Sequence, residues 1–259
     1  MVRRASHLFE EPGMPDKVIC QIVAWFRKYL LATASREKSL AAINDRFLDR
    51  RDAGRQLANA LARFAESEPL ILALPRGGVP VAFEVAKALQ APLDLLIVRK
   101  IGAPGHEEFG LGAVVDGDDP QIVLNMEDVS LVNPPPGYVE AEAQRQFREI
   151  ERRRRLYLRG RHPVPTKGRT VILVDDGIAT GGTMRAALKA MRRTGARLIL
   201  AAVPVASPNG IEALQHEADE IICLKEPETL EAITLHYVDF RQTTDAEVVH
   251  LLNEAWPQR

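Results

Sequence analysis

The stretch that most constrains the fold is Val171–Thr183, with the sequence VILVDDGIATGGT. Its first four residues are branched and apolar, a run that is too short for a helix and typical of a strand buried on both faces. Asp175 and Asp176, the acid pair, follow where this strand would end, and an apolar helical pattern begins at Met184. This order predicts a helix whose first backbone N–H groups bind an anion, most commonly phosphate.

The turn between the acid pair and the helix, here called the Thr-Gly loop, adds two hydroxyl groups to those backbone donors. It consists of Ala179, Thr180, Gly181, Gly182 and Thr183. Paired carboxylates at the carboxyl end of a strand suit sugar hydroxyls or a hydrated Mg²⁺. An ordinary strand–loop–helix crossover with surface aspartates is the alternative, but such a turn needs neither paired acids nor two glycines between threonines.

Strand and helix patterns alternate along the chain, which predicts an α/β fold with a mainly parallel central sheet flanked by helices. Strands are predicted at 70–74, 93–98, 198–203 and 220–224, an inserted hairpin at 111–115 and 121–124, and helices at 79–89, 138–158, 210–216 and 245–256. We therefore divide the chain into an N-terminal helical extension (1–45), a main domain (46–242) and a C-terminal helix (243–259) packed on that domain.

Bulk composition limits the classes of function. The chain has 259 residues and a formal net charge of −1, so a general nucleic-acid-binding role is not supported and any basic function must be local. Its two cysteines, Cys20 and Cys223, fit a reducing cytosol and neither a zinc site nor a disulfide framework. No apolar run approaches about 18 residues, and the N-terminus lacks the features of a signal peptide. We expect a cytoplasmic protein without a membrane segment.

An amphipathic helix is predicted from Asp16, with its apolar residues on one stripe. That stripe consists of Val18, Ile22, Trp25, Phe26 and Tyr29. It fits packing on the domain, a dimer contact or a membrane surface. The polar face is not notably basic, which favours the first two, and we expect a homodimer.

Two further loops carry candidate anion ligands. Pro75–Gly78, here called the Arg-Gly loop, follows the first predicted strand, and its glycines let the backbone approach an anion while Arg76 offers a fork of donors. A plain helix-start turn is the alternative. Residues 99–110, RKIGAPGHEEFG, contain three glycines, a proline and four charged residues, and predict a mobile loop. Its charged side chains are either ligands or surface groups.

The predicted helix at 138–158 carries a basic stripe that continues just past its end. The stripe consists of Arg145, Arg148, Arg152, Arg155 and Arg159. A solvated face paired with glutamates of the same helix is the favoured interpretation. A positive wall beside a phosphate-rich ligand is the functional alternative. A nucleic-acid face is the weakest, since no aromatic residues interleave with the arginines.

Val171–Thr183 resembles, at all 13 positions by residue type, the phosphoribosyl-diphosphate (PRPP) motif of type I phosphoribosyltransferases. With LPRGG and RKIG, the three segments look like a bacterial branch of that family, and the resemblance covers about residues 46–242. It implies that the acid pair holds the ribose hydroxyls, directly or through Mg²⁺, and that the Thr-Gly loop binds the 5′-phosphate. It also implies a hood for the acceptor, expected within residues 120–165.

The same resemblance assigns the remaining site residues. The implied catalytic residues are Asp175, Asp176, Arg76 and Lys100, with the two aspartates as metal ligands; Arg76, Gly77, Gly78, Arg99 and Lys100 bind pyrophosphate, and His106 and Glu108 belong to a lid. The family often has a non-proline cis peptide in the pyrophosphate loop, expected here at Pro75–Arg76.

Two departures from the family pattern narrow the expected function. Ala103 stands where the orotate branch has a further loop lysine, and Ala179 stands where purine salvage members have an aspartate that serves as general base. Ala179 therefore argues against hypoxanthine or guanine as the acceptor, and a pyrimidine, an amine or another nucleophile stays possible. The expected activity is Mg²⁺-dependent transfer of a phosphoribosyl group from PRPP to a small-molecule acceptor. A regulatory protein that binds PRPP or a nucleotide without turnover is the alternative. A third possibility, a pyrophosphokinase that makes PRPP, would need an ATP site, and the sequence shows none.

Overall fold

The computed structural model describes residues 45–117 and 120–256. Its internal contacts divide the chain after Arg46, and the unit that begins at Phe47 is the one described below. The predicted N-terminal helix and Cys20 lie outside the described residues. Among the residues that are described, no helix is long and apolar enough to cross a membrane.

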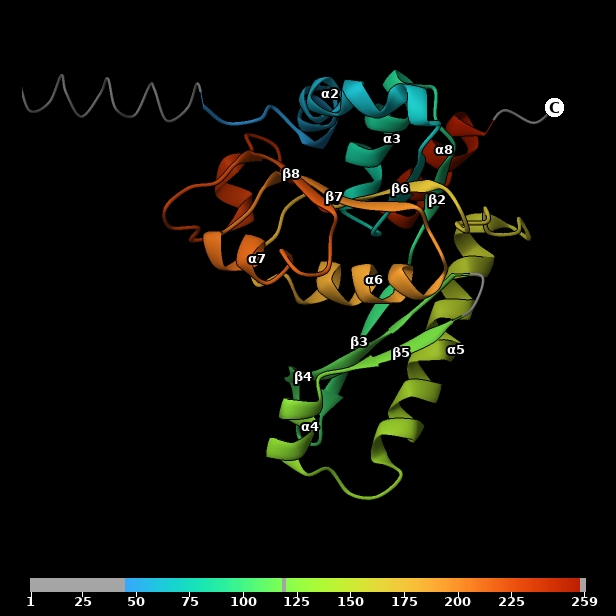
Figure 1. Cartoon of the computed structure of the whole chain (residues 1–259), viewed down its shortest axis with the longest axis vertical. Coiled ribbons are helices and arrows are strands. Elements are labelled where there is room, and N and C mark those ends of the chain that lie inside the picture. The colour runs from blue at the N-terminus through green and yellow to red at the C-terminus, as the bar shows by residue number, and fades with distance from the viewer. Residues whose placement is uncertain (1–44, 118–119, 257–259) are drawn as a thin grey trace, which may run out of the picture. The chain divides into compact units, whose positions relative to one another are not determined.

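The core of the unit is a five-stranded parallel sheet with the strand order β2-β1-β6-β7-β8. The strands are β1 (Leu70–Ala73), β2 (Leu93–Leu95), β6 (Thr170–Val174), β7 (Leu198–Val205) and β8 (Glu220–Lys225). The predicted fold class is confirmed, because these strands alternate with helices that cover both faces of the sheet (Figure 1).

Alternating side chains of the central strand divide the core into two layers. Ile172 and Val174 of β6 belong to a cluster that includes, among others, the apolar faces of three helices, whereas Val171 and Leu173 pack with a fourth helix. The first three helices are α2 (Arg50–Leu61), α3 (Gly78–Leu89) and α8 (Asp245–Ala255), and the fourth is α6 (Gly182–Arg193). A strand buried on both faces is what its uninterrupted apolar sequence predicts.

A second sheet and two helices form an insertion, here called the hood. The antiparallel strands are β3 (Val98–Ala103), β4 (His106–Val115) and β5 (Gln121–Leu124), and the helices are α4 (Met126–Val132) and α5 (Tyr138–Leu158). Figure 1 shows the hood extending away from the parallel sheet, with α5 running back toward it. The range expected for the hood, 120–165, contains β5, α4 and α5, but the antiparallel sheet begins earlier, at Val98.

The hood corrects two predictions. Residues 99–110 are not a loop, because β3 and β4 pair across them with a bulge near Gly102. The glycines of this segment were interpreted as loop formers, yet in this sheet glycine permits close strand approach: a Cβ on Gly102 would lie 2.7 Å from the carbonyl oxygen of Glu107. The predicted strand at 93–98 is likewise divided between the two sheets, with Leu96 and Ile97 as the connection.

The remaining elements are short. They are the 3₁₀ helices η3 (Ala62–Ser67) and η4 (Ile233–His236) and the helix α7 (Pro208–Glu212). The stretch around η4 joins the start of the unit to its end, because Phe47 forms a parallel bridge with Tyr237.

Candidate active site

The acid pair lies at the carboxyl end of β6, in the middle of the parallel sheet. β6 is fully buried along its five residues, and the two aspartates that follow it are only partly exposed. The backbone N–H of Asp176 donates to Oδ1 of Asp175 at 2.8 Å. Burial, and then the negative charge of Asp176, raise the pKa of the Asp175 carboxyl well above its usual range. Two adjacent carboxylates in so little water favour a cation or hydroxyl donors between them.

The Arg-Gly loop lies directly against the acid pair, although it comes about 100 residues earlier in the chain. A Cβ on Gly77 would be 2.1 Å from Oδ2 of Asp176, and one on Gly78 would be 2.6 Å from the carbonyl oxygen of Val174. Only glycine permits this approach. The Pro75–Arg76 peptide bond is cis, at the expected position.

The Thr-Gly loop begins α6, as predicted. Gly181 is the residue before the helix, with a φ of 77°, and the N–H of Arg185 donates to its carbonyl oxygen at 2.8 Å. Thr180, Gly182 and Thr183 line a cleft of about 530 Å³. The start of the helix is therefore open to a ligand and not filled by side chains.

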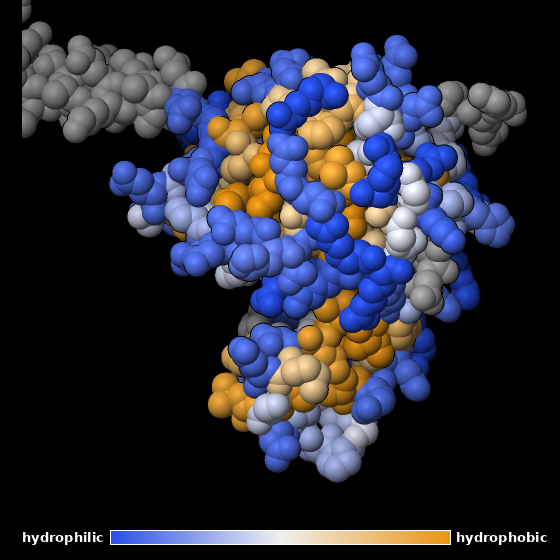
Figure 2. Space-filling model, in the orientation of Figure 1, coloured by the Kyte–Doolittle hydropathy of each residue, from blue (hydrophilic) through white to orange (hydrophobic). Residues whose placement is uncertain are grey.

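The opposite wall of this cleft belongs to the hood. Its lining includes Lys100, Asn125 and Asp128, together with apolar residues of β3, β4 and β5, while Arg185 and Lys189 line it from α6. Figure 2 shows apolar residues gathered on the hood, below a band of polar residues. Among the exposed large hydrophobic residues, β5 and α4 contribute Ile122, Met126 and Leu131.

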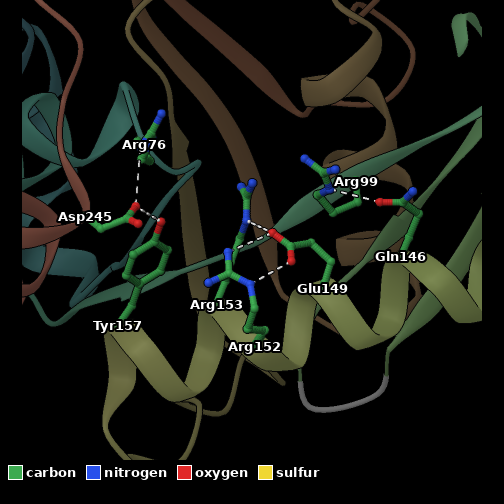
Figure 3. A network of polar contacts seen from close by, with 8 residues as sticks. All are labelled: Arg76, Arg99, Gln146, Glu149, Arg152, Arg153, Tyr157 and Asp245. Atoms are coloured by element: carbon green, nitrogen blue, oxygen red, sulfur yellow. Dashed lines mark hydrogen bonds and ion pairs between the residues drawn. The ribbon is translucent and has the colours of Figure 1, made fainter.

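Arg99 points away from this cleft, although it neighbours Lys100. Successive side chains of a strand lie on opposite faces, and Arg99 faces α5, where its Nε donates to Oε1 of Gln146 at 3.0 Å (Figure 3). Burial, and then the charge of Arg153, lower the pKa of Arg99. The predicted pair of pyrophosphate ligands is thus divided between the two faces of the hood sheet.

Arg76 extends from the Arg-Gly loop toward α8. Its Nη1 lies 3.4 Å from Oδ1 of Asp245, and the hydroxyl of Tyr157 donates to the same oxygen at 2.6 Å (Figure 3). The hydrogen bond from Tyr157 and the charge of Arg76 lower the pKa of Asp245, although burial opposes them. Residues of α5 and α8 thereby fix the direction of the one arginine that the sequence assigns to the Arg-Gly loop.

The other candidates stand as follows. His106 is exposed at the start of β4, opposite Ala103, and the backbone of Glu108 lies within the same strand. Three members of the basic stripe pair with glutamates of their own helix, in the pairs Arg145–Glu142, Arg152–Glu149 and Arg155–Glu151. For these three arginines the interpretation as a solvated, paired face is confirmed.

Sequence reasoning missed several residues that contact the site. Arg50 of α2 forms an ion pair with Asp176, and Tyr237, Asp245, Tyr157 and Gln146 hold site residues from distant parts of the chain. The only local signal was the expected domain boundary between residues 45 and 46, shortly before Arg50. In the described residues no cluster of three or more histidine, cysteine or acidic side chains forms a candidate metal site. The acid pair supplies carboxylate oxygens, which fits Mg²⁺, an ion commonly held by one or two carboxylates plus substrate phosphates.

Comparison with known proteins agrees with this geometry. The family model described as "Phosphoribosyl transferase domain" matches residues 43–239. A Mycobacterium tuberculosis H37Rv protein named "Putative phosphoribosyl transferase" is 44% identical over 209 residues, which are 81% of this chain and 47% of that protein. An adenine phosphoribosyltransferase of Mycobacterium marinum is 54% identical over 39 residues, 15% of this chain and 21% of that one. The crystal structure of TT1426 from Thermus thermophilus matches with 45% identity and a TM-score of 0.72, covering 81% of this chain and 98% of that one.

The chain therefore belongs to the phosphoribosyl transferase domain family. Its parallel sheet, its acid pair and its two glycine loops are the parts that form the candidate site. The chain spans about half the length of the Mycobacterium tuberculosis relative that it matches.

Proposed function

We propose that this chain transfers the 5-phosphoribosyl group of PRPP to a nucleophile, a nucleobase or an amine, with release of pyrophosphate. The observation that carries the proposal is the contact between the Arg-Gly loop and the acid pair, where a Cβ on Gly77 would meet Oδ2 of Asp176 at 2.1 Å. Two separate anion-binding loops then flank a pair of carboxylates at one edge of the sheet. A sugar with a phosphate on one side and a diphosphate on the other matches that layout.

Each part of the site has a role in this reaction. The Thr-Gly loop binds the 5′-phosphate through Thr180 to Thr183, and Gly77, Gly78 and Arg76 bind the pyrophosphate. The acid pair accepts hydrogen bonds from the ribose hydroxyls and holds Mg²⁺, which when bound neutralises charge on the departing pyrophosphate. The transition state resembles an oxocarbenium ion, so the cationic side chains stabilise charge that develops on the leaving group.

The acceptor is assigned to the cleft between the hood and α6. Its apolar lining from Val98, Ala113, Val123 and Leu124 suits the face of a planar base, and Lys100 lies beside it. We further propose that the protein works as a homodimer in the cytosol, where the free thiol of Cys223 stays reduced.

The direct test is pyrophosphate release from PRPP and Mg²⁺ across a panel of bases and amines. Replacing Asp175 and Asp176 together with asparagine keeps the volume of the side chains but removes their charge. The double variant is expected to lose turnover with every acceptor, by at least about 1,000-fold, because both the sugar and metal ligands are gone. Retained turnover in this variant excludes the proposal.

A second function, binding of PRPP as a signal without transfer, is favoured by one observation. Arg99 is held by Gln146 on the far face of the hood sheet, so the predicted lid brings fewer cations to the cleft. Exchange of labelled pyrophosphate into PRPP, measured with each acceptor present, separates the two functions, because a sensor shows binding and no exchange.

A further inference from the structure

The first residue of α2 reaches the acid pair across the fold. Nε and Nη2 of Arg50 each lie 2.8 Å from Oδ2 of Asp176, with 126 positions between the two residues in the sequence. The Arg50 and Asp176 side chains are only 11% and 14% exposed. This ion pair is therefore largely shielded from water. Charge-assisted hydrogen bonds are stronger in such an environment than on an open surface.

Arg50 is itself fixed by two more contacts. Its Nη1 donates to the carbonyl oxygen of Arg241 at 2.7 Å, and its Cζ lies 3.7 Å from the centroid of the Phe240 ring. The backbone of Asp176 is fixed as well, because the hydroxyl of Tyr237 donates to its carbonyl oxygen at 2.6 Å. Tyr237 packs between the rings of Phe47 and Phe240. Arginine suits this position because its planar head can stack and donate from several nitrogens at once.

Both donors from Arg50 converge on the same carboxylate oxygen. Oδ2 of Asp176 thereby accepts from both nitrogens and also faces Gly77, whereas neither of these two donors is directed at Oδ1. A carboxylate held at one oxygen presents the other in a fixed direction. We propose that Arg50 is a positioning residue, which holds Asp176 so that Oδ1 is presented to the ribose hydroxyls and Mg²⁺. This inference rests on the proposed function, since it assigns Asp176 to the sugar.

A positioning role also answers an electrostatic difficulty of the site. Two neighbouring carboxylates at a site with little water repel each other, and either one can turn away or take up a proton. The fork of Arg50 compensates one charge and restricts the side chain of Asp176 to one rotamer. A lysine would supply the charge but neither the fork nor the stack.

The adjacent residue offers a matched control. Arg51 is the second residue of α2. Its Nε lies 2.6 Å from Oε1 of Glu84, and its Cζ lies 5.2 Å from the centroid of the Phe83 ring. It has the same chemistry of ion pair and aromatic contact, but it touches neither aspartate of the acid pair. Arg51→Gln therefore measures what the loss of such a pair does to the fold alone.

The test is calorimetric titration of the full chain with three ligands: inorganic phosphate, ribose 5-phosphate with Mg²⁺, and PRPP with Mg²⁺. Inorganic phosphate requires only an anion-binding loop, whereas the two sugar phosphates also require the acid pair. Arg50→Gln is expected to weaken both sugar phosphates by about 10- to 100-fold, the usual effect of losing a group that orients a ligating side chain. Phosphate affinity should change by less than about 2-fold. Arg50→Lys should recover part of the loss, and Arg51→Gln should leave all three affinities unchanged.

Two further variants make every result decisive. Phe240→Leu keeps both charges and removes the stack on Arg50 together with the ring contact to Tyr237, so it is informative even if Arg50→Gln does not fold. It should weaken ribose 5-phosphate by about 3-fold. If Arg50→Gln weakens phosphate and sugar phosphate equally, its role is only structural and the inference is wrong. If Asp176→Asn weakens the sugar phosphates and neither Arg50→Gln nor Phe240→Leu does, the inference fails while the proposed function stands. If the unaltered protein binds neither sugar phosphate, the proposed function itself fails.

Discussion

The two walls of the candidate site are built by different means. On the core side, the Arg-Gly loop and the acid pair approach each other through backbone, at positions where a Cβ on Gly77 or Gly78 would clash. On the hood side, the cations are placed by the alternation of a strand, which sends Lys100 into the cleft and Arg99 to α5. The core wall depends on the glycines of the Arg-Gly loop, where backbone contacts the acid pair, so the course of the chain itself fixes its geometry. The hood wall depends on which face each side chain occupies.

The largest expected effect comes from adding one methyl group to the core wall. In Gly77→Ala the new Cβ would lie 2.1 Å from Oδ2 and 2.6 Å from Cγ of Asp176, so the loop or the carboxylate must move. We expect PRPP binding, measured by calorimetry, to weaken by more than about 100-fold, since small misplacements of site groups have effects of that size.

The hood offers a matched glycine. In Gly110→Ala the nearest atoms to the new Cβ are Cδ and Cγ of Lys100, at 3.1 and 3.3 Å, and a flexible lysine can move aside. PRPP affinity should then change by only about 3-fold, which is less than about 1 kcal/mol. Equal losses in Gly77→Ala and Gly110→Ala would contradict the distinction between a rigid core wall and an adaptable hood wall.

A second comparison concerns Asp116, which contacts Arg154 of α5, and Glu149, which lies on α5 itself. Burial is the main cause that raises the pKa of Asp116 to about 6, although Arg154 lies 2.8 Å away and opposes it. Between about pH 4 and 6 the folded protein therefore holds a proton on Asp116 that the unfolded chain releases, and the free energy of unfolding falls as pH rises through this range. The shift limits the loss to about 3 kcal/mol.

Urea unfolding of the wild type and of Asp116→Asn at several pH values tests this prediction, because the difference in unfolding free energy between them should fall from about pH 4 to 6. Glu149 is the contrast: hydrogen bonds from Arg152 and Arg153 lower its pKa to about 2, so its contribution to stability is present above pH 4.5 and is lost at lower pH. A wild-type advantage over Asp116→Asn that grows over the same range would mean that the ion pair with Arg154 outweighs burial.

The sequence predicted the core wall well and the hood wall poorly, for physical reasons. Strand β6, the acid pair and the start of α6 are one continuous segment, so local patterns determine their order in space. The hairpin of β3 and β4 was misjudged because its glycines also fit a loop. Arg50, Tyr237 and Asp245 were not predicted at all, because their contacts with the site join residues far apart in the chain and no spacing pattern encodes such contacts.

Effects smaller than that of Gly77→Ala should separate the two faces of β3. Lys100→Ala removes a cation from the cleft and should weaken PRPP binding by about 10-fold, which corresponds to about 1.4 kcal/mol. Arg99→Ala removes the hydrogen bond to the buried Gln146 and should lower the free energy of unfolding by about 1 kcal/mol. Its effect on PRPP affinity should stay below about 2-fold.

Calorimetry and urea unfolding of both variants together decide whether the alternation of β3 governs function. If Arg99→Ala weakens PRPP as strongly as Lys100→Ala does, then β3 or α5 rearranges when the ligand binds, and both cations reach the pyrophosphate as the family resemblance implied. If only Lys100→Ala weakens binding, the hood contributes one cation from this strand, and the arginine beside it belongs to the packing of α5.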